Sequence, residues 1–261
     1  MFIDVHGITL GYDDVGEGLA VVLLHAFPLH RAMWATTRKA LAHDYRVITP
    51  DARGFGESSG ADSATMDDLA DDLIGLLDAL GIQTAVVGGL SLGGYVALNL
   101  VGRYPERVRG LILADTRAAA DTAEGVLNRR TLADQALNEG ARSIADRTLP
   151  KMLSAHAAPD VVTALRAMIE SAVPQAIAIT SHGMAARADS TPRLATITVP
   201  TLIVVGSDDS ITPVADSLVL HKAIPNASLA IIPDAGHVSV LEQPQAFNRA
   251  LAVFLASLDD A

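Results

Sequence analysis

The chain has 261 residues, half of them hydrophobic, which is enough to bury one large domain or a core with an insertion. Its formal net charge of −11 argues against nucleic acid and anionic membrane surfaces as partners. Because it contains no cysteine, disulfides, zinc–thiolate sites and a cysteine nucleophile are excluded. The first residues lack the basic region and apolar core of a secretion signal, so we expect a cytoplasmic protein.

Short apolar runs bounded by glycine-containing loops predict strands, and stretches with helical spacing predict helices between them. Residues 20–24 are continuously apolar, which is typical of a strand buried on both faces. Residues 13–18 are polar and contain glycine, so they predict a loop. Besides the stretch around Ser91, the predicted strands are 2–5, 8–12, 20–24, 45–49, 108–114, 199–206 and 227–232, and the predicted helices are 34–42, 66–80, 215–223 and 243–258.

The helix over 66–80 starts with a capping signature, in which Thr65 is followed three residues later by Asp68. Four aspartates crowd this helix, and a metal site is one interpretation of them. The other interpretation, which we favour, is a solvated acidic face stabilised by the helix N-terminus. These aspartates are Asp67, Asp68, Asp71 and Asp72.

Residues 117–193 lack the short apolar runs that predict strands elsewhere, and their helical spacing predicts about four helices inserted as a lid. The predicted domains are therefore a core of residues 1–116 and 194–261 and a helical lid of residues 117–193. Because strands alternate with helices on both sides of the insertion, we predict an α/β fold. Its mostly parallel sheet of about eight strands has helices on both faces. Ligands of such sheets bind at the carboxyl ends of the strands.

Residues 86–98, VVGGLSLGGYVAL, pass from an apolar run through glycines and one serine, Ser91, into a helical pattern. Gly89 and Gly93 complete a G-x-S-x-G nucleophile elbow, whose turn requires small neighbours of the serine. The alternative is a tight turn in which Ser91 only caps the helix. Residues 82–102 carry no charge and are long enough to span a bilayer, but their glycines and polar side chains argue against this.

A serine hydroxyl needs a base to accept its proton, and this base is usually a histidine oriented by a carboxylate. Among eight histidines we favour His237, which follows the last predicted strand on a glycine-containing loop. His25 ends a strand and is predicted to shape the neighbouring loop. The oxyanion needs N–H donors, for which the backbones of Leu92 and Phe27 are the candidates. Pro28 has no N–H to donate.

Asp208 and Asp209 follow a predicted buried strand and are the main candidates for the acid. Because neighbouring side chains of an extended chain point in opposite directions, only one of them is expected to reach His237. The other is predicted to cap the helix that begins near Pro213. Asp115, which also ends a strand, is a third candidate for the acid.

Four motifs together resemble the α/β-hydrolase superfamily, and the resemblance covers nearly the whole chain. Residues 25–28, HAFP, resemble its oxyanion loop, with alanine in place of the usual glycine, and residues 51–58, DARGFGES, resemble a structural turn. Residues 89–94 are similar to the elbow of 3-oxoadipate enol-lactonases and related esterases, and His237 matches the catalytic histidine. The spacing of the family's acid selects Asp209.

The resemblance implies a serine hydrolase of carboxylic esters that forms an acyl-enzyme on Ser91, with His237 as base and Asp209 as acid. A serine at position 91 disfavours the epoxide hydrolases and dehalogenases of the superfamily, which use an aspartate there. No metal and no cofactor are expected, and the partner is a small-molecule ester or lactone. Candidates for the acyl pocket, which are equally well explained as core residues, are Trp34, Met152, Leu153 and Met184.

Lactone hydrolysis is the alternative, since a lactone is a cyclic ester that uses the same machinery. Perhydrolysis, as in the cofactor-free haloperoxidases, comes next, and a non-catalytic receptor for a small molecule comes last. An acidic lactone would require basic side chains near the site, and the lid and its flanks supply Arg117, Arg129, Arg130 and Arg187. The oligomeric state is left open by the sequence.

Overall fold

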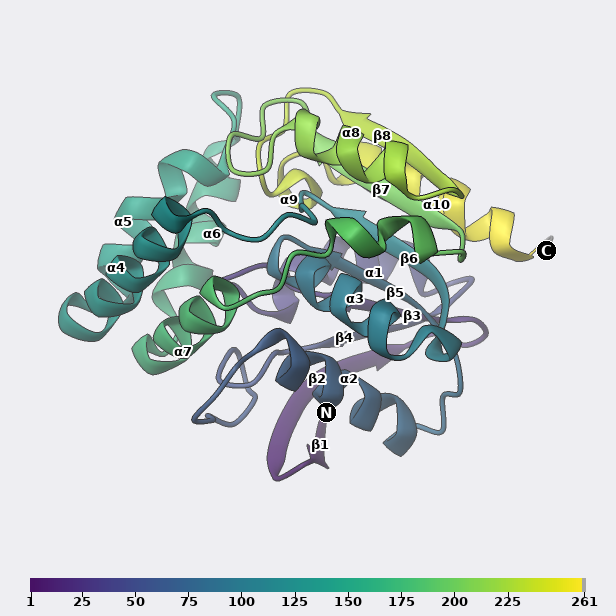
Figure 1. Ribbon diagram of the computed structural model, residues 1–261, viewed down its shortest axis with the longest axis horizontal. Coiled ribbons are helices and arrows are strands. Elements are labelled where there is room, and N and C mark those ends of the chain that lie inside the picture. Colours follow the sequence, from purple (N-terminus) through teal and green to yellow (C-terminus); the bar gives the residue numbers. More distant parts are fainter. Residues whose placement is uncertain (260–261) are drawn as a thin grey trace.

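The computed structural model describes residues 1–259, within which eight strands form one sheet in the order β1-β2-β4-β3-β5-β6-β7-β8 (Figure 1). β1 and β2 are antiparallel to their neighbours, and all other neighbouring strands are parallel. The predicted α/β fold with a mostly parallel sheet is therefore confirmed. The strands are β1 Phe2–Val5, β2 Ile8–Val15, β3 Ala20–Leu24, β4 Arg46–Pro50, β5 Ala85–Leu90, β6 Val108–Ala114, β7 Thr201–Gly206 and β8 Ala227–Ile232.

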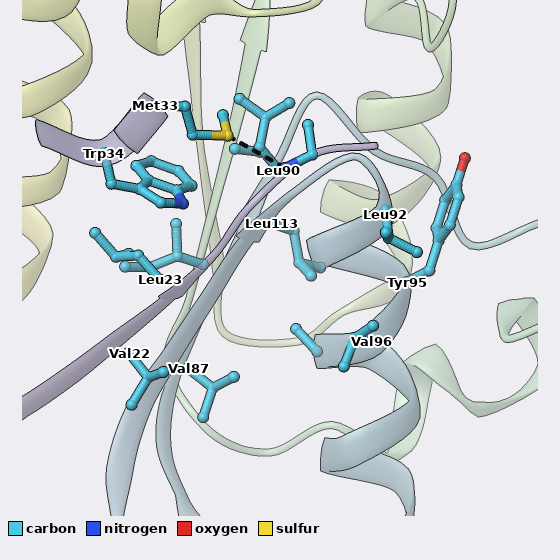
Figure 2. Close-up of a cluster of buried hydrophobic side chains, with 14 of the residues drawn as sticks. Val22, Leu23, Met33, Trp34, Val87, Leu90, Leu92, Tyr95, Val96 and Leu113 are labelled. Atoms are coloured by element: carbon cyan, nitrogen blue, oxygen red, sulfur yellow. Dashed lines mark hydrogen bonds between the residues drawn. The ribbon is translucent and has the colours of Figure 1, made fainter. Parts of the chain in front are cut away.

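Helices cover both faces of the sheet, with α1 and α10 on one side and α2, α3 and α8 on the other (Figure 1). Figure 2 shows Trp34 on one side of the central strands, and Leu92 and Val96 of α3 on the other. Both faces of β3 and β5 are thereby buried, which explains their continuous apolar sequence. The helices are α1 Ala35–Leu41, α2 Met66–Ala79, α3 Leu92–Arg103, α4 Ala123–Glu139, α5 Ala141–Met152, α6 Pro159–Glu170, α7 Pro174–Ala185, α8 Val214–Ala223, α9 Ser239–Glu242 and α10 Pro244–Asp259.

The loop predicted over residues 13–18 is wrong in its first half, because β2 extends to Val15. This part of β2 pairs with β4, and its two aspartates are held by arginines from elsewhere in the chain. Asp13 pairs with Arg38 at 2.9 Å and Asp14 with Arg46 at 2.7 Å. The two aspartates can therefore lie in a β-strand because arginines that are distant in the sequence neutralise their charges.

The capping box at the start of α2 is confirmed, since Thr65 and Asp68 bond to each other's backbone N–H. The solvated acidic face is wrong for Asp72, which is 4 % exposed and binds both Nε and Nη2 of Arg53 at 2.7 Å. Burial of this carboxylate is stabilised by two charge-assisted bonds to a planar guanidinium. Within residues 1–259 no group of three histidine, aspartate or glutamate side chains is placed to hold a metal ion.

The helices α4 to α7 lie between β6 and β7 in the sequence, within the residues predicted to form a lid, and extend beyond one end of the sheet (Figure 1). In the described part of the chain no single helix is long and apolar enough to cross a membrane. Only α6 and α7 pass such a test together, and they meet at an angle of 93°.

One buried carboxylate holds three arginines where this helical segment joins the core. The Asp121 side chain, 1 % exposed, accepts hydrogen bonds from Arg117 at 2.9 Å, Arg129 at 3.0 Å and Arg187 at 3.4 Å. Arg187 also donates to the carbonyl of Ala119, and its guanidinium lies 3.8 Å from the ring centre of Tyr95 on α3. The two chain segments that connect the helices to the sheet are thereby joined through Asp121.

Replacing Asp121 by alanine is expected to lower the free energy of unfolding by about 3–5 kcal/mol, because it removes the carboxylate partner of the buried Arg187 and of the partly exposed Arg117 and Arg129. Burial alone would raise the pKa of Asp121, but the arginines outweigh it and lower that pKa. The stabilisation is therefore fully present above the ordinary aspartate pKa of about 3.9 and is lost as the pH falls through the folded-state pKa.

Urea unfolding of wild type and Asp121→Ala at several pH values measures this difference. It should be constant near neutral pH and shrink in acid. Asp146→Ala is the matched control, because Asp146 pairs with Arg166 at 2.7 Å but is 60 % exposed, and its loss should cost at most about 1 kcal/mol. Equal effects of the two substitutions would contradict a structural role for the buried cluster.

Candidate active site

Ser91 lies at the turn between β5 and α3 with a φ of 55° and a ψ of −107°, a region that non-glycine residues rarely adopt. Its N–H donates to the carbonyl of Ala114 on β6 at 2.9 Å. A Cβ atom on Gly89 would lie 2.1 Å from the carbonyl carbon of Gly93, and one on Gly93 would lie 2.3 Å from the carbonyl oxygen of Leu24. Only glycine at both positions lets strand and helix approach closely enough to form this turn.

His237 and Asp209 meet at the carboxyl ends of β8 and β7, where Nδ1 of the histidine lies 2.9 Å from Oδ2 of the aspartate. Both residues are buried. Asp208 is exposed and accepts a hydrogen bond from its neighbour Ser207. The expectation that Asp208 caps the next helix is wrong, because Pro213 occupies the N-cap of α8 and no side chain caps it. Proline at this position has its φ fixed by the ring and carries no side-chain oxygen that could accept a hydrogen bond from the helix.

Thr212, which the sequence did not identify, also takes part in the contact between His237 and Asp209. Its hydroxyl donates to Oδ2 of Asp209 at 2.7 Å and lies 3.2 Å from Nδ1 of His237. The N–H groups of Ile211 and Thr212 donate to the other oxygen of Asp209, at 2.8 and 3.0 Å. Burial would raise the pKa of Asp209, but His237 and Thr212 lower it, so the carboxylate stays ionised. The only available signal was an aspartate followed closely by a threonine, which is common in turns.

Asp115, the third candidate acid, is fully buried and has partners of its own. Its carboxyl accepts hydrogen bonds from the N–H of Gly206 at 2.8 Å and from the hydroxyl of Ser239 at 2.5 Å. Burial and the nearby charge of Asp209 raise the pKa of Asp115 well above its ordinary value, which favours the neutral form. Asp115 thus connects the ends of β6 and β7 with α9 and has no hydrogen bond to His237.

The loop after β3 is held by His25 and Met33. Nε2 of His25 accepts the N–H of Ala52 at 2.9 Å, and Nδ1 lies 2.9 Å from the carbonyl of Ala26, so Nδ1 carries the proton. Burial lowers the pKa of His25 and keeps this neutral form. The N–H of Ala26 donates to the sulfur of Met33 at 3.2 Å (Figure 2).

Two backbone donors next to this loop and the elbow are free. Among residues 1–259, neither the N–H of Phe27 nor that of Leu92 has an acceptor within the chain. Unpaired N–H groups in a protein interior are rare, so these two are available to a ligand. The Ser91 hydroxyl and Nε2 of His237 have no hydrogen-bond partner in the described residues either, and no bond joins the two.

The candidate pocket residues are distributed over three places. Trp34 packs against Phe247 of α10 with 6.0 Å between ring centres, on a face of the sheet. Met152 and Leu153 lie at the end of α5, beside the loop that carries His237. Met184 is buried in α7.

Comparison with known proteins agrees with the fold. The family model described as the alpha/beta hydrolase fold matches residues 20–244. A thermophilic esterase from Thermogutta terrifontis, solved with malate bound, is 41 % identical with a TM-score of 0.95, covering 98 % of this chain and 97 % of its own.

Enol-lactonases are also similar. A 3-oxoadipate enol-lactonase of Acinetobacter baylyi is 31 % identical over 94 % of this chain and 92 % of its own. The crystal structure of the enol-lactonase from Burkholderia xenovorans LB400 is 30 % identical with a TM-score of 0.91, covering 98 % and 100 % of the two chains. The chain therefore belongs to the α/β-hydrolase family, among its esterases and lactonases.

Proposed function

We propose that the protein hydrolyses carboxylic esters through an acyl-enzyme on Ser91, with His237 as the base and Asp209 as the acid. The observation that carries the proposal is the buried contact between His237 and Asp209, which leaves Nε2 of the imidazole without a hydrogen-bond partner among residues 1–259. This contact lies at the same edge of the sheet as the strained turn at Ser91. A serine hydrolase requires such an arrangement of nucleophile, base and acid.

The reaction follows from these groups. Oγ of Ser91 attacks the ester carbonyl carbon while Nε2 of His237 takes the hydroxyl proton, and Asp209 stabilises the imidazolium. The N–H groups of Phe27 and Leu92 bind the oxyanion, because the described part of the chain offers them no competing acceptor. The bond between the carbonyl carbon and the alcohol oxygen then breaks, and the imidazolium protonates the departing alkoxide, which leaves as the alcohol. Water then attacks the acyl carbonyl carbon while His237 takes a proton from it, the bond to Oγ of Ser91 breaks, and the imidazolium returns the proton to Oγ. The products are the carboxylic acid and free Ser91, and no step requires a metal or cofactor.

Lactone hydrolysis is the second candidate, and the similarity to enol-lactonases favours it. An acidic lactone would need free basic side chains near the site. Three of the four candidates, Arg117, Arg129 and Arg187, are bound by Asp121, which favours neutral esters. We also propose that residues 117–193 act as the lid over the site, with the small-molecule ester as partner.

The test combines turnover with covalent trapping. Wild type should release p-nitrophenol from at least one of the acetate, butyrate and octanoate esters, and a fluorophosphonate should add one adduct to the peptide that contains Ser91. A parallel panel of neutral and acidic lactones separates the two candidate functions. If neither esters nor lactones are hydrolysed and no adduct forms, the enzymatic proposal is wrong and ligand binding becomes the alternative.

A further inference from the structure

The segment that leaves α5 lies directly against the loop that carries His237. The backbone N–H of His237 donates to the carbonyl of Met152 at 2.9 Å. The next residue back in that loop, Gly236, is so close that a Cβ atom on it would lie 2.7 Å from the backbone nitrogen of Ser154. Part of the predicted lid is therefore in backbone contact with the proposed catalytic base.

One carboxylate is bonded both to the histidine loop and to the segment after α5. Glu242, the last residue of α9, accepts the N–H of Gly236 with Oε1 and the N–H of Ser154 with Oε2, both at 2.8 Å. Hydrogen bonds from backbone N–H groups to a charged oxygen are stronger than those between neutral groups. No salt bridge to Glu242 is found in residues 1–259, so its two oxygens serve this bridge.

We propose that Glu242 is a positioning residue, which fixes the histidine loop to the segment after α5 so that Nε2 of His237 points at Ser91. Asp209 and Thr212 hold the imidazole only at Nδ1, so the direction of Nε2 depends on where the backbone of residue 237 lies. The bridge fixes that backbone one residue away, at Gly236. This inference rests on the proposed function, because it gives His237 the role of base.

The arrangement has a consequence for motion of the lid. The same short segment accepts the N–H of His237 at the carbonyl of Met152 and donates the N–H of Ser154 to Glu242. A displacement of this segment would break both bonds, and the histidine loop would then lose these two attachments to the segment after α5. The position of His237 therefore depends on the position of the segment after α5.

The test variant is Glu242→Gln, which keeps the size of the side chain but turns an NH₂ group toward one of the two N–H donors. Gln243→Ala is the matched control, because Gln243 contacts the carbonyl of Asp234 in the same loop and has no bond to the lid. Glu106→Gln, an exposed site remote from the loop, controls for loss of one charge. Active enzyme is counted by fluorophosphonate titration, and kcat and KM for p-nitrophenyl butyrate are expressed per titrated site.

We expect Glu242→Gln to lower kcat about tenfold to hundredfold, because small displacements of catalytic groups are costly, with KM nearly unchanged. The rate of phosphonylation should fall in parallel, because it also needs His237. Amide hydrogen exchange should become faster at Gly236, His237 and Ser154, which reports on the bridge without reference to catalysis. Both controls should behave like wild type.

A merely structural role would lower the number of titrated sites and leave kcat per site unchanged, and that result would overturn the proposal. Unchanged amide exchange in the Glu242→Gln variant would also overturn it. A wild type inert to both ester and fluorophosphonate would instead refute the proposed function and, with it, the role of Glu242 in orienting a base.

Discussion

Replacing Ser91 by alanine is expected to lower kcat for ester hydrolysis by about a millionfold, because the attacking oxygen is removed while the rest of the site remains. Alanine has the same Cβ atom as serine, so the strained backbone with a φ of 55° should be kept and the fold should be unchanged. The measurement is the release of p-nitrophenol from the butyrate ester, with KM and thermal stability followed in parallel. The variant should also lose the fluorophosphonate adduct.

Ser217→Ala is the matched control for this experiment. Ser217 is fully buried in α8, and its hydroxyl, like that of Ser91, lacks a hydrogen-bond partner among residues 1–259. Ser217→Ala also removes one buried hydroxyl group, but from α8 instead of the active site, and should leave kcat unchanged. Retention of more than about one per cent of activity by Ser91→Ala would place the nucleophile elsewhere and refute the acyl-enzyme, given the size of the expected loss.

The sequence predicted those elements correctly whose defining residues lie close together in the chain. The predicted strands 108–114 and 227–232 coincide with β6 and β8, because each is an apolar run bounded by turn residues. The capping box at Thr65 was equally readable, since both partners lie within four residues. α9 was missed because four residues are too few to show helical periodicity.

Features that depend on distant partners could not be predicted in this way. Asp72 is buried because Arg53 reaches it, and β2 extends to Val15 because β4 pairs with it. At the site, motif order placed Asp209 and His237 next to each other, but it said nothing of Thr212 or Glu242. Their contacts depend on which loops the fold brings together, and neither residue belongs to a recognisable motif.

Replacing Asp209 by asparagine is expected to lower kcat about ten-thousandfold, the second-largest effect, because an amide neither stabilises the imidazolium nor holds its proton at Nδ1. The carboxylate accepts four hydrogen-bond contacts, from Ile211, Thr212 and His237. Burial would raise the pKa of Asp209, but His237 and Thr212 lower it and keep the carboxylate charged. The loss should therefore be the same throughout the neutral and mildly alkaline range. Kinetics with the butyrate ester between about pH 6 and 9 measure it.

The effect is expected at Asp209 and not at the two other candidate acids, Asp208 and Asp115. Asp208→Asn should be nearly silent, because that side chain is exposed and accepts a hydrogen bond from its neighbour Ser207 rather than from His237. Asp115 is not expected to replace the lost acid, because its oxygens are occupied by Gly206 and Ser239 and burial favours its neutral form. An Asp209→Asn variant that kept more than about a tenth of wild-type activity would contradict this assignment, and a second substitution at Asp115 would then show whether that carboxyl had taken over.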